Sequence, residues 1–226
     1  MTQRDKEDLF QRRIAALRIQ NEQFPWTSGD SPQYEIPRED SKLFSERDSE
    51  GRDISDAELE RRALLDLTSQ NFKTFYKRLN YELRRARRYV RPVSLCLVGI
   101  DRFEEVAIRI GQEAKSAAVD GAGKVLLASI RDVDIAGRCR EDTFGVILPE
   151  TPRSGAEVAA ERIRTKLEKH VISGIWQPFA ITVSVGVAHF PEGVTELEDM
   201  FAQAAEALLA NMRSGGNRVS FGRPFS

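Results

Sequence analysis

The hydrophobic positions of this chain follow helix and strand spacings in turn from about residue 72 onward. Apolar residues recur every three to four positions over residues 72–90, which predicts a helix with one face on a core. The run VSLCLVGI (93–100) is continuously apolar and of strand length, so it predicts a central strand buried on both faces. Residues 133–139 and 144–149 predict two further strands, joined by a tight polar hairpin.

The second half of the chain continues this pattern. A short helix is expected after Asp101 and a longer one through Val119 to Ile130. Further elements are predicted as a helix at 153–170, a strand at 179–190, a helix from Leu197 to Met212 and a closing edge strand at 217–221. Together these elements predict an α+β sandwich, with a central mixed, mostly antiparallel sheet flanked by helices.

The N-terminal third has a different pattern. Residues 1–23 predict a short amphipathic helix, which either packs on its own domain or docks on a partner. Residues 24–53 are rich in Pro, Ser, Asp, Glu and Arg, which is typical of a flexible arm. We therefore expect three parts: a short helix and flexible charged arm (1–55), a helical stem (56–66) and one folded domain (67–226).

Composition and charge narrow the function. The 226 residues carry a net charge of −1, and Arg84, Arg85, Arg87, Arg88 and Arg91 form the densest basic run. We interpret this run as a solvated helix face, with phosphate binding as the weaker alternative, and the overall balance argues against nucleic acid. The chain has no apolar stretch of about 18 residues and no secretory signal, so we expect a cytoplasmic protein that does not cross a membrane.

The two cysteines and two histidines suggest no special chemistry. Cys96 and Cys139 lie inside apolar stretches and are expected to be buried, reduced thiols. His170 and His189 are too few to suggest a zinc cluster.

Several motifs in a fixed order indicate a family. They are Leu67-Thr68 at the domain entry, RRARRYVRPVSLCLVGIDRF through the first strand, Arg131-Asp132-Val133-Asp134, AERIR at 160–164, SVGVA at 184–188 and GNRV at 216–219. In this order the segment from about Asp66 to Phe221 resembles the GGDEF family of diguanylate cyclases. The resemblance implies the family's fold and a role in bacterial signalling by cyclic di-GMP.

The resemblance also implies where a catalytic site would lie. The family joins two GTP molecules with the help of divalent metal ions, which are held by carboxylates at the end of the first strand and in the hairpin. Here Gly99 occupies the first carboxylate position, and Asp101 is kept. The hairpin reads Arg140-Glu141-Asp142-Thr143-Phe144, so only Asp142 matches a metal-binding acid.

Other positions of the family's GTP pocket differ too. Ala107 and Ser116 stand at the guanine-recognition positions, Glu104 stands where a Lys is common, and Met212 and Gly216 replace phosphate-binding residues. We therefore expect a degenerate member of the family that is not an enzyme, with no catalytic residue, no metal site and no cofactor.

A second site of the family is kept in this sequence. The resemblance implies that Arg131 and Asp134, five residues before the hairpin motif, bind cyclic di-GMP together with Arg162 from the following helix. Arg binds guanine O6 and N7 or phosphate, and a carboxylate accepts from guanine N–H groups. We also count Arg138 among the ligand-binding residues, since Arg138 and Arg140 add positive potential nearby.

Simpler interpretations of these same residues stay open. Arg131 and Asp134 flank a helix-to-strand turn and could simply pair there, and Arg162 could be an ordinary surface residue. Three functions follow: a receptor for cyclic di-GMP, a ligand-independent interaction scaffold that recruits a protein partner through residues 1–55, or a working cyclase in which Asp101, Glu141 and Asp142 gather a metal. The receptor is favoured, and a homodimer is compatible with it.

Overall fold

In this computed structural model, the described residues are 67, 72–173, 177–192, 194 and 196–223. The predicted N-terminal helix, charged arm and helical stem all precede residue 67 and lie outside the described residues. Among the described residues, no helix is both long and apolar enough to cross a membrane.

A five-stranded sheet lies at the centre of the domain, with strand order β2-β3-β1-β6-β7. Its strands are β1 (Val93–Ile100), β2 (Ile135–Arg138), β3 (Thr143–Pro149), β6 (Val183–Phe190) and β7 (Val219–Phe221). Neighbouring strands are antiparallel except for the parallel pair β6 and β7. The predicted mixed, mostly antiparallel sheet is thus confirmed, including the β2–β3 hairpin and the closing edge strand.

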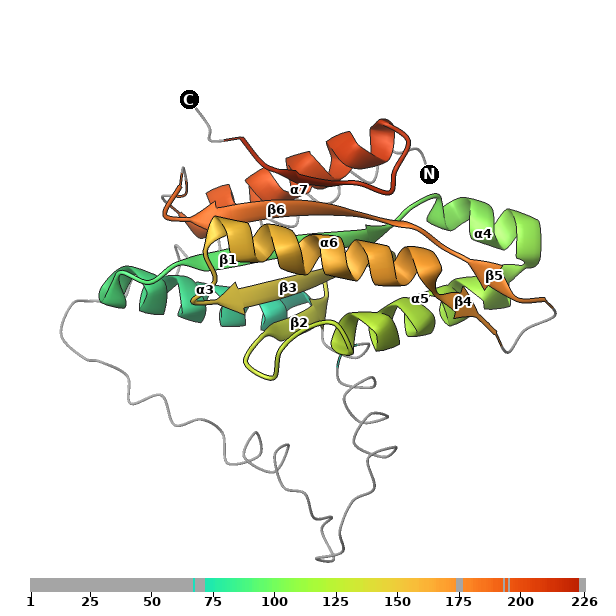
Figure 1. Ribbon diagram of the computed structural model, residues 1–226, viewed down its shortest axis with the longest axis horizontal. Coiled ribbons are helices and arrows are strands. Elements are labelled where there is room, and N and C mark those ends of the chain that lie inside the picture. The colour runs from blue at the N-terminus through green and yellow to red at the C-terminus, as the bar shows by residue number, and fades with distance from the viewer. Residues whose placement is uncertain (1–66, 68–71, 174–176, 193, 195, 224–226) are drawn as a thin grey trace, which may run out of the picture. The chain divides into compact units, whose positions relative to one another are not determined.

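Helices cover both faces of this sheet. α3 (Phe72–Tyr89) and α7 (Leu197–Arg213) pack on one face, and α5 (Gln112–Leu127) and α6 (Arg153–Lys169) pack on the other. The short α4 (Phe103–Ile110) leads into α5. In Figure 1, α6 lies across the sheet, and α4 and α5 extend beyond the end where β1 stops. The α+β sandwich expected from the hydrophobic pattern is therefore present.

The central strand β1 separates the hydrophobic core into two halves, one on each face of the sheet. Every residue of β1 is buried, as expected for a strand with helices on both faces. Because side chains alternate along a strand, Cys96, Val98 and Ile100 join the cluster beneath α5 and α6. On the other face, Phe72, Phe75, Tyr76 and Phe201 form an aromatic group between α3 and α7, with ring centroids 5.4–6.2 Å apart.

One predicted strand is divided. The sequence pattern predicts a single strand over residues 179–190, but the structure forms β5 (Phe179–Ala180) and then β6. β5 pairs with β4 (Val171–Ile172) in a separate two-stranded sheet. The single-strand prediction is wrong because strand pairing changes within this segment. Residues 179–190 share one pattern of high β-propensity, but the first part pairs with β4 and the second part joins the central sheet.

Both cysteines are buried free thiols. Burial raises the pKa of the Cys96 thiol to about 12 and also raises that of Cys139. These thiols are protonated at neutral pH, so they serve as small apolar side chains of the core.

Candidate functional site

The turn between α5 and β2 fixes one side of the candidate site. The backbone N–H of Arg131 donates to Asp134 Oδ2 (2.8 Å), and the N–H of Asp134 donates to the carbonyl oxygen of Arg131 (3.0 Å). This reciprocal pair closes the turn and sets the direction of the Asp134 carboxylate. The alternative drawn from the sequence, that Arg131 and Asp134 pair with each other at this turn, is therefore present in the structure.

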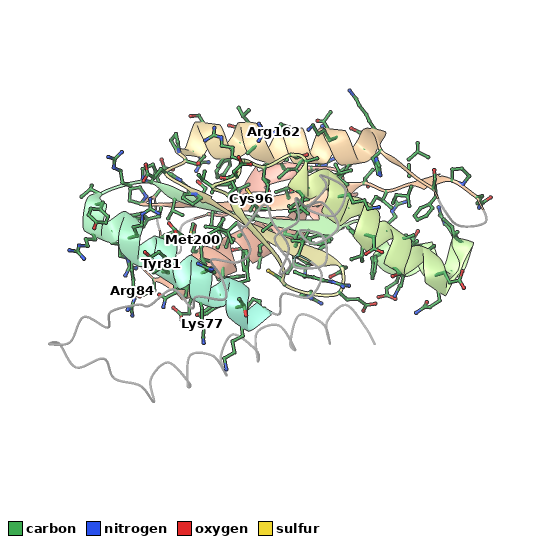
Figure 2. The ribbon with its side chains drawn as sticks, turned by 90° about the horizontal axis from the view of Figure 1, so that it is seen from below. Lys77, Tyr81, Arg84, Cys96, Arg162 and Met200 are labelled. Carbon is green, nitrogen blue, oxygen red and sulfur yellow. The ribbon has the colours of Figure 1, made fainter. Side chains whose placement is uncertain are left out.

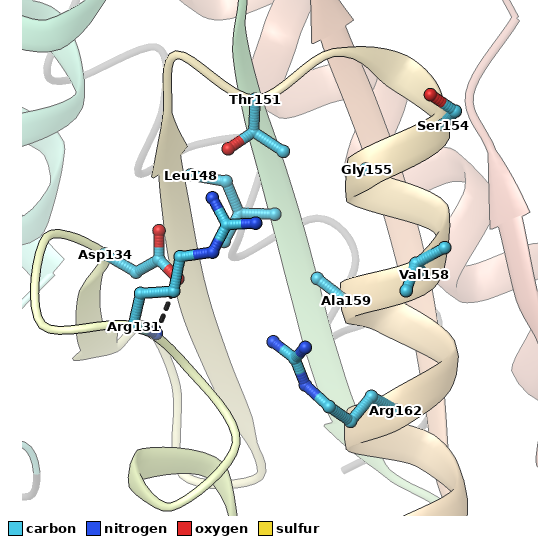
Figure 3. Close-up of a pocket in the computed structure, with 9 residues that line it drawn as sticks. All are labelled: Arg131, Asp134, Leu148, Thr151, Ser154, Gly155, Val158, Ala159 and Arg162. Atoms are coloured by element: carbon cyan, nitrogen blue, oxygen red, sulfur yellow. Dashed lines mark hydrogen bonds between the residues drawn. The ribbon is translucent and has the colours of Figure 1, made fainter.

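Arg162 approaches from α6 on the opposite side. Its Nε donates to the carbonyl oxygen of Ser129 (2.9 Å), just after α5 ends. Figure 3 shows the guanidinium groups of Arg131 and Arg162 reaching into the same space from two different elements. A backbone acceptor thus takes one N–H of Arg162 and leaves its terminal nitrogens directed toward that space.

Between them lies a pocket of about 270 Å³. Its walls come from the α5–β2 turn, from β3 and from the first half of α6. They are formed by Arg131, Asp134, Leu148, Thr151, Ser154, Gly155, Val158, Ala159 and Arg162. The structure therefore brings three of the predicted ligand residues together around one opening, which combines an apolar floor with two cations and one carboxylate.

Asp134 is the polar side chain of this pocket whose hydrogen bonds are incomplete. Its Oδ1 is buried and has no hydrogen-bond partner in the described part of the protein. Burial raises the pKa of the Asp134 carboxyl, and the Arg131 backbone N–H and the Arg131 and Arg162 guanidinium groups lower it in part. A buried carboxylate oxygen without a donor is costly, so this geometry favours a ligand that brings N–H groups.

Arg138 does not share this pocket. Its Nε donates to the Arg140 carbonyl (3.2 Å), and its NH2 group donates to the Glu141 carbonyl (2.8 Å). Arg138 therefore holds the backbone of the β2–β3 hairpin. Arg138 does not line the pocket, and two of its five N–H groups are taken by these backbone carbonyls, so its role in ligand binding stays a prediction.

The hairpin residues 140–144 make mostly local contacts. Thr143 Oγ1 donates to Asp142 Oδ1 (2.9 Å), and Arg140 Nε lies 3.9 Å from the same oxygen. Glu141 lies 3.8 Å from Lys115. Phe144 is fully buried at the start of β3. The hairpin is thus fixed by its own side chains and by the neighbouring α5.

Asp101 holds several elements together at the end of β1. Its Oδ1 accepts from Ser184 Oγ (2.7 Å), and its Oδ2 accepts from Thr182 Oγ1 (2.8 Å) and from the backbone N–H of Asn217 (2.7 Å). Gly99, two residues earlier, faces Leu208 and Met212 of α7. Among the described residues, no three His, Cys, Asp or Glu side chains are placed so that they could hold a metal ion together. The side chains of Asp101, Glu141 and Asp142 therefore do not form such a group.

Two charged clusters escaped the sequence reasoning. Lys115 Nζ lies 2.7 Å from Glu104 and 4.8 Å from the centre of the Phe103 ring, which links α4 to α5. Arg164 binds Asn217 (2.7 Å) and thereby ties α6 to the loop before β7. The sequence does not reveal these contacts, because the paired residues are distant in sequence or meet only where two helices pack. The exception is the helical spacing of Arg164 with Glu161 and Glu168, which predicts ion pairs within α6.

The five-stranded sheet, the helices on both its faces and the β2–β3 hairpin define an α+β domain of the nucleotidyl-cyclase type. A family match identifies it further: residues 67–218 match the family described as "Diguanylate cyclase, GGDEF domain". The chain therefore belongs to the GGDEF family of diguanylate cyclases, as the sequence motifs indicated.

Curated relatives carry the same family name. Diguanylate cyclase DosC of Escherichia coli K12 is 29% identical over 181 residues, which is 79% of this chain and 37% of that protein. Diguanylate cyclase DgcM of the same strain is 32% identical over 126 residues, 56% of this chain and 30% of that protein. Diguanylate cyclase A of Treponema denticola is 27% identical over 131 residues, 58% of this chain and 35% of that protein. The chain thus spans about a third of the length of these relatives.

Solved structures share the fold. The active GGEEF domain of a diguanylate cyclase from Vibrio cholerae has a TM-score of 0.63 and 24% identity, covering 70% of this chain and 98% of that one. The GGDEF domain of DgcB from Caulobacter crescentus, in complex with c-di-GMP, has a TM-score of 0.64 and 24% identity, covering 69% and 90%. At this identity, both likenesses concern the fold alone.

These comparisons overturn one expectation. The sequence analysis concluded from the substituted motif positions that the chain is not an enzyme. The matched family is that of the diguanylate cyclases, and the curated relatives are named as such. Nothing in the fold or the comparisons gives evidence that activity has been lost, so the conclusion drawn from Gly99 and the hairpin is wrong as stated.

Proposed function

We propose that this domain recognises cyclic di-GMP at the pocket formed by Arg131, Asp134 and Arg162, and acts as a receptor for it in bacterial cytoplasmic signalling. The observation that carries the proposal is the buried Asp134 Oδ1, which lacks a donor within the described residues and lies at the same pocket as two guanidinium groups. Guanine supplies N–H donors for the carboxylate, and its O6 and N7 accept from Arg. The phosphodiesters supply anionic oxygens for the second Arg.

The pocket favours a planar base over a simple anion. Leu148, Val158 and Ala159 give it apolar surface, while its polar groups include both donors and an acceptor. A free phosphate would satisfy the cations but would place negative charge beside Asp134. A nucleotide base beside a phosphate uses all three charged groups and both kinds of surface.

Calorimetric titration of the whole chain with cyclic di-GMP tests this proposal. A separate sample is first denatured and the released material is checked by chromatography, so that the protein used for titration is known to be free of bound nucleotide. We expect measurable binding that Arg131→Ala weakens by about 30-fold, since a hydrogen bond to a charged group contributes about 1.5–3 kcal/mol. Arg109→Ala, on the exposed side of α4, serves as the matched control and should bind like the wild type.

The titration also separates the alternatives. No heat with ligand-free protein would overturn the proposal and would favour a scaffold that recruits its partner through residues 1–55. Equal binding by wild type and Arg131→Ala would move the ligand to another site. Incubation of the same preparation with GTP and Mg²⁺ or Mn²⁺, followed by chromatography, measures cyclase activity independently, because a receptor site and a cyclase site can coexist in one domain.

Acid pH should weaken this binding. The pKa of Asp134 is raised by burial from its usual value of 3.8, so the carboxyl takes up a proton more readily in the free protein. A protonated Oδ1 cannot accept from guanine, so the bound state favours the ionised form and binding releases a proton. Affinity should therefore rise with pH through the raised pKa and then level off. Asp134→Asn should bind weakly with no such pH dependence, and an equally steep profile in this variant would contradict the assignment.

A further inference from the structure

A buried polar pair lies beside the apolar side chains beneath α5 and α6. Ser94 carries the one hydroxyl group of β1, and it lies directly opposite His189 in the β1–β6 pair. Ser94 is 0% exposed and His189 is 6% exposed, and Ser94 Oγ lies 2.9 Å from His189 Nδ1. Figure 2 shows Cys96, from the same face of β1, beneath the helix α6 that carries Arg162. The pair is therefore on the α6 side of the sheet, as is the pocket of Arg131 and Arg162 (the Arg131 pocket).

The hydrogen bonds of this pair run in one direction. Ser94 Oγ also lies 3.0 Å from the carbonyl oxygen of Thr151, which can only accept, so the single hydroxyl hydrogen of Ser94 is donated there. The Ser94 oxygen then accepts from His189, which places a hydrogen on Nδ1 of the imidazole ring. Burial lowers the pKa of His189, with smaller opposing effects of Glu192, which raises it, and Arg153, which lowers it, so the ring is neutral at neutral pH. The chain of donors thus runs from His189 through Ser94 to Thr151.

The Thr151 carbonyl depends on this chain of hydrogen bonds. Thr151 lies between the end of β3 at Pro149 and the start of α6 at Arg153, in a segment that we call the β3–α6 corner (149–153). Thr151 is 4% exposed, and in the described part of the chain the donor that reaches its carbonyl is the Ser94 hydroxyl. A buried carbonyl without a donor is costly, so Ser94 determines where the backbone can lie at this corner.

The β3–α6 corner forms one end of the Arg131 pocket. Figure 3 shows Thr151 at that end, on the side toward which Arg131 reaches. The Thr151 hydroxyl donates to the Pro149 carbonyl (2.9 Å), which fixes the side chain as well as the backbone. A Cβ on Gly155 would meet Thr151 Cγ2 at 3.0 Å, so the Thr151 methyl group already lies against the first turn of α6. A shift of Thr151 would therefore move two walls of the pocket, the corner and this first turn.

Other contacts of the β3–α6 corner lie at the surface. Arg153 lies 3.1 Å from Glu192, and Glu150 lies 2.8 Å from Arg85, but these side chains are between 40% and 56% exposed. Exposed ion pairs of this kind contribute little to stability. In addition, Glu150 has a φ of 49°, which residues other than glycine adopt only at a cost. The buried hydrogen bonds from His189 are therefore the contacts best placed to hold this strained corner.

We propose that Ser94 and His189 are positioning residues of the Arg131 pocket. Their hydrogen bonds hold the β3–α6 corner so that Thr151 and the first turn of α6 are in place for the ligand. This inference rests on the proposed function, because the ligand whose affinity it concerns is cyclic di-GMP. Neither side chain lines the pocket, so each acts through Thr151 and not by touching the ligand.

Titration of three variants with cyclic di-GMP tests this role. Ser94→Ala removes the donor to Thr151 and should weaken binding about fivefold, as expected for the loss of one hydrogen bond. His189→Leu removes only the group that orients the Ser94 hydroxyl, so its effect should be smaller, about two- to threefold. His189→Asn has nearly the shape of the Leu variant but keeps an N–H donor, so it should bind like the wild type. Equal weakening by Leu and Asn would contradict the role given to the His189 donor.

Ser184→Ala is the matched control. Ser184 is likewise 0% exposed and belongs to the β1–β6 pair, but it lies opposite Gly99 and donates to Asp101 at the other end of the strands. Its loss should lower the free energy of unfolding about as much as Ser94→Ala does, without changing the affinity for cyclic di-GMP. In ligand-free protein, the amide signals of residues 151–155 should shift in Ser94→Ala and stay in place in Ser184→Ala. Equal loss of affinity in both variants would show that general destabilisation is the cause and would overturn the proposal.

The ring of His189 gives a test that needs no ligand. In ¹⁵N-labelled wild-type protein at neutral pH, the chemical shifts of the ring nitrogens should report a neutral imidazole with its hydrogen on Nδ1. A hydrogen on Nε2 would mean that Ser94 donates to His189 and not to Thr151, and the proposal would be wrong. Absence of binding by the wild type would overturn the proposed function and this inference with it. Binding by the wild type with unchanged affinity in Ser94→Ala would overturn this inference alone.

Discussion

Asp101→Ala is expected to lower the free energy of unfolding by about 3 kcal/mol. Asp101 is 8% exposed, and its carboxylate accepts three hydrogen bonds, from Ser184, Thr182 and the backbone of Asn217. Its removal leaves the hydroxyl of the fully buried Ser184 and one backbone N–H without their acceptor, and each unsatisfied group costs about 1–3 kcal/mol. Urea unfolding of the variant and of the wild type measures the difference.

Asp142→Ala is the matched control for this prediction. The Asp142 side chain is 21% exposed, accepts from the hydroxyl of the adjacent Thr143 and lies 3.9 Å from Arg140. Its loss should change the free energy of unfolding by less than about 1 kcal/mol. Equal losses in the two variants would show that the Asp101 contacts across β1, β6 and the loop before β7 do not stabilise the domain more than a local pair does.

This contrast bears on the reading of catalytic motifs. Asp101 was singled out as the one acid kept at the end of the first strand, yet its contacts give it a structural role that suffices to explain its presence. In the same way, the glycine at position 99 packs against α7 and does not by itself report on activity. Cyclase activity depends on the whole site and is measured with GTP. Substituted residues in a motif were therefore a weak basis for excluding that activity.

The sequence predicted most elements because their signals are local. β1 was predicted at its observed bounds from one apolar run, and the amphipathic spacing of α3 and α7 follows from burial on one side. The break between β5 and β6 was missed because strand pairing depends on residues distant in sequence. The helix predicted to run through Ile130 ends at Leu127, and the chain then turns toward Arg131.

The candidate site was predictable where the family spacing fixes it. Arg131 and Asp134 lie on one turn, and the pattern of α6 places Arg162 opposite them. Arg138 shows what the sequence leaves open: its charge near the site is visible, but the backbone carbonyls that accept two of its N–H groups are not. The same holds for Lys115 and Glu104, which meet only because α4 packs against α5.

Gly186→Ala should destabilise the domain as strongly as the loss of Asp101. Gly186 lies in the middle of β6, directly beneath α7, and an added Cβ would overlap the carbonyl oxygen of Ala204 and the backbone nitrogen of Leu208. These atoms belong to the helix backbone and cannot rotate away, so α7 would have to move off the sheet. Overpacking of this kind costs about 3 kcal/mol, again measured by urea unfolding.

Gly121→Ala is the same substitution in a more tolerant place. There the added Cβ would meet Cγ1 and Cδ1 of Ile172 at 2.9 and 3.2 Å, and that side chain can shift. Because Gly121 is inside α5, alanine also gains about 1 kcal/mol of helix propensity, so the net change should stay within about 1 kcal/mol. If Gly186→Ala lowers the free energy of unfolding no more than Gly121→Ala does, the contact between α7 and β6 is looser than the structure indicates. The buried β6–α7 interface would then not be a main source of stability on that face of the sheet.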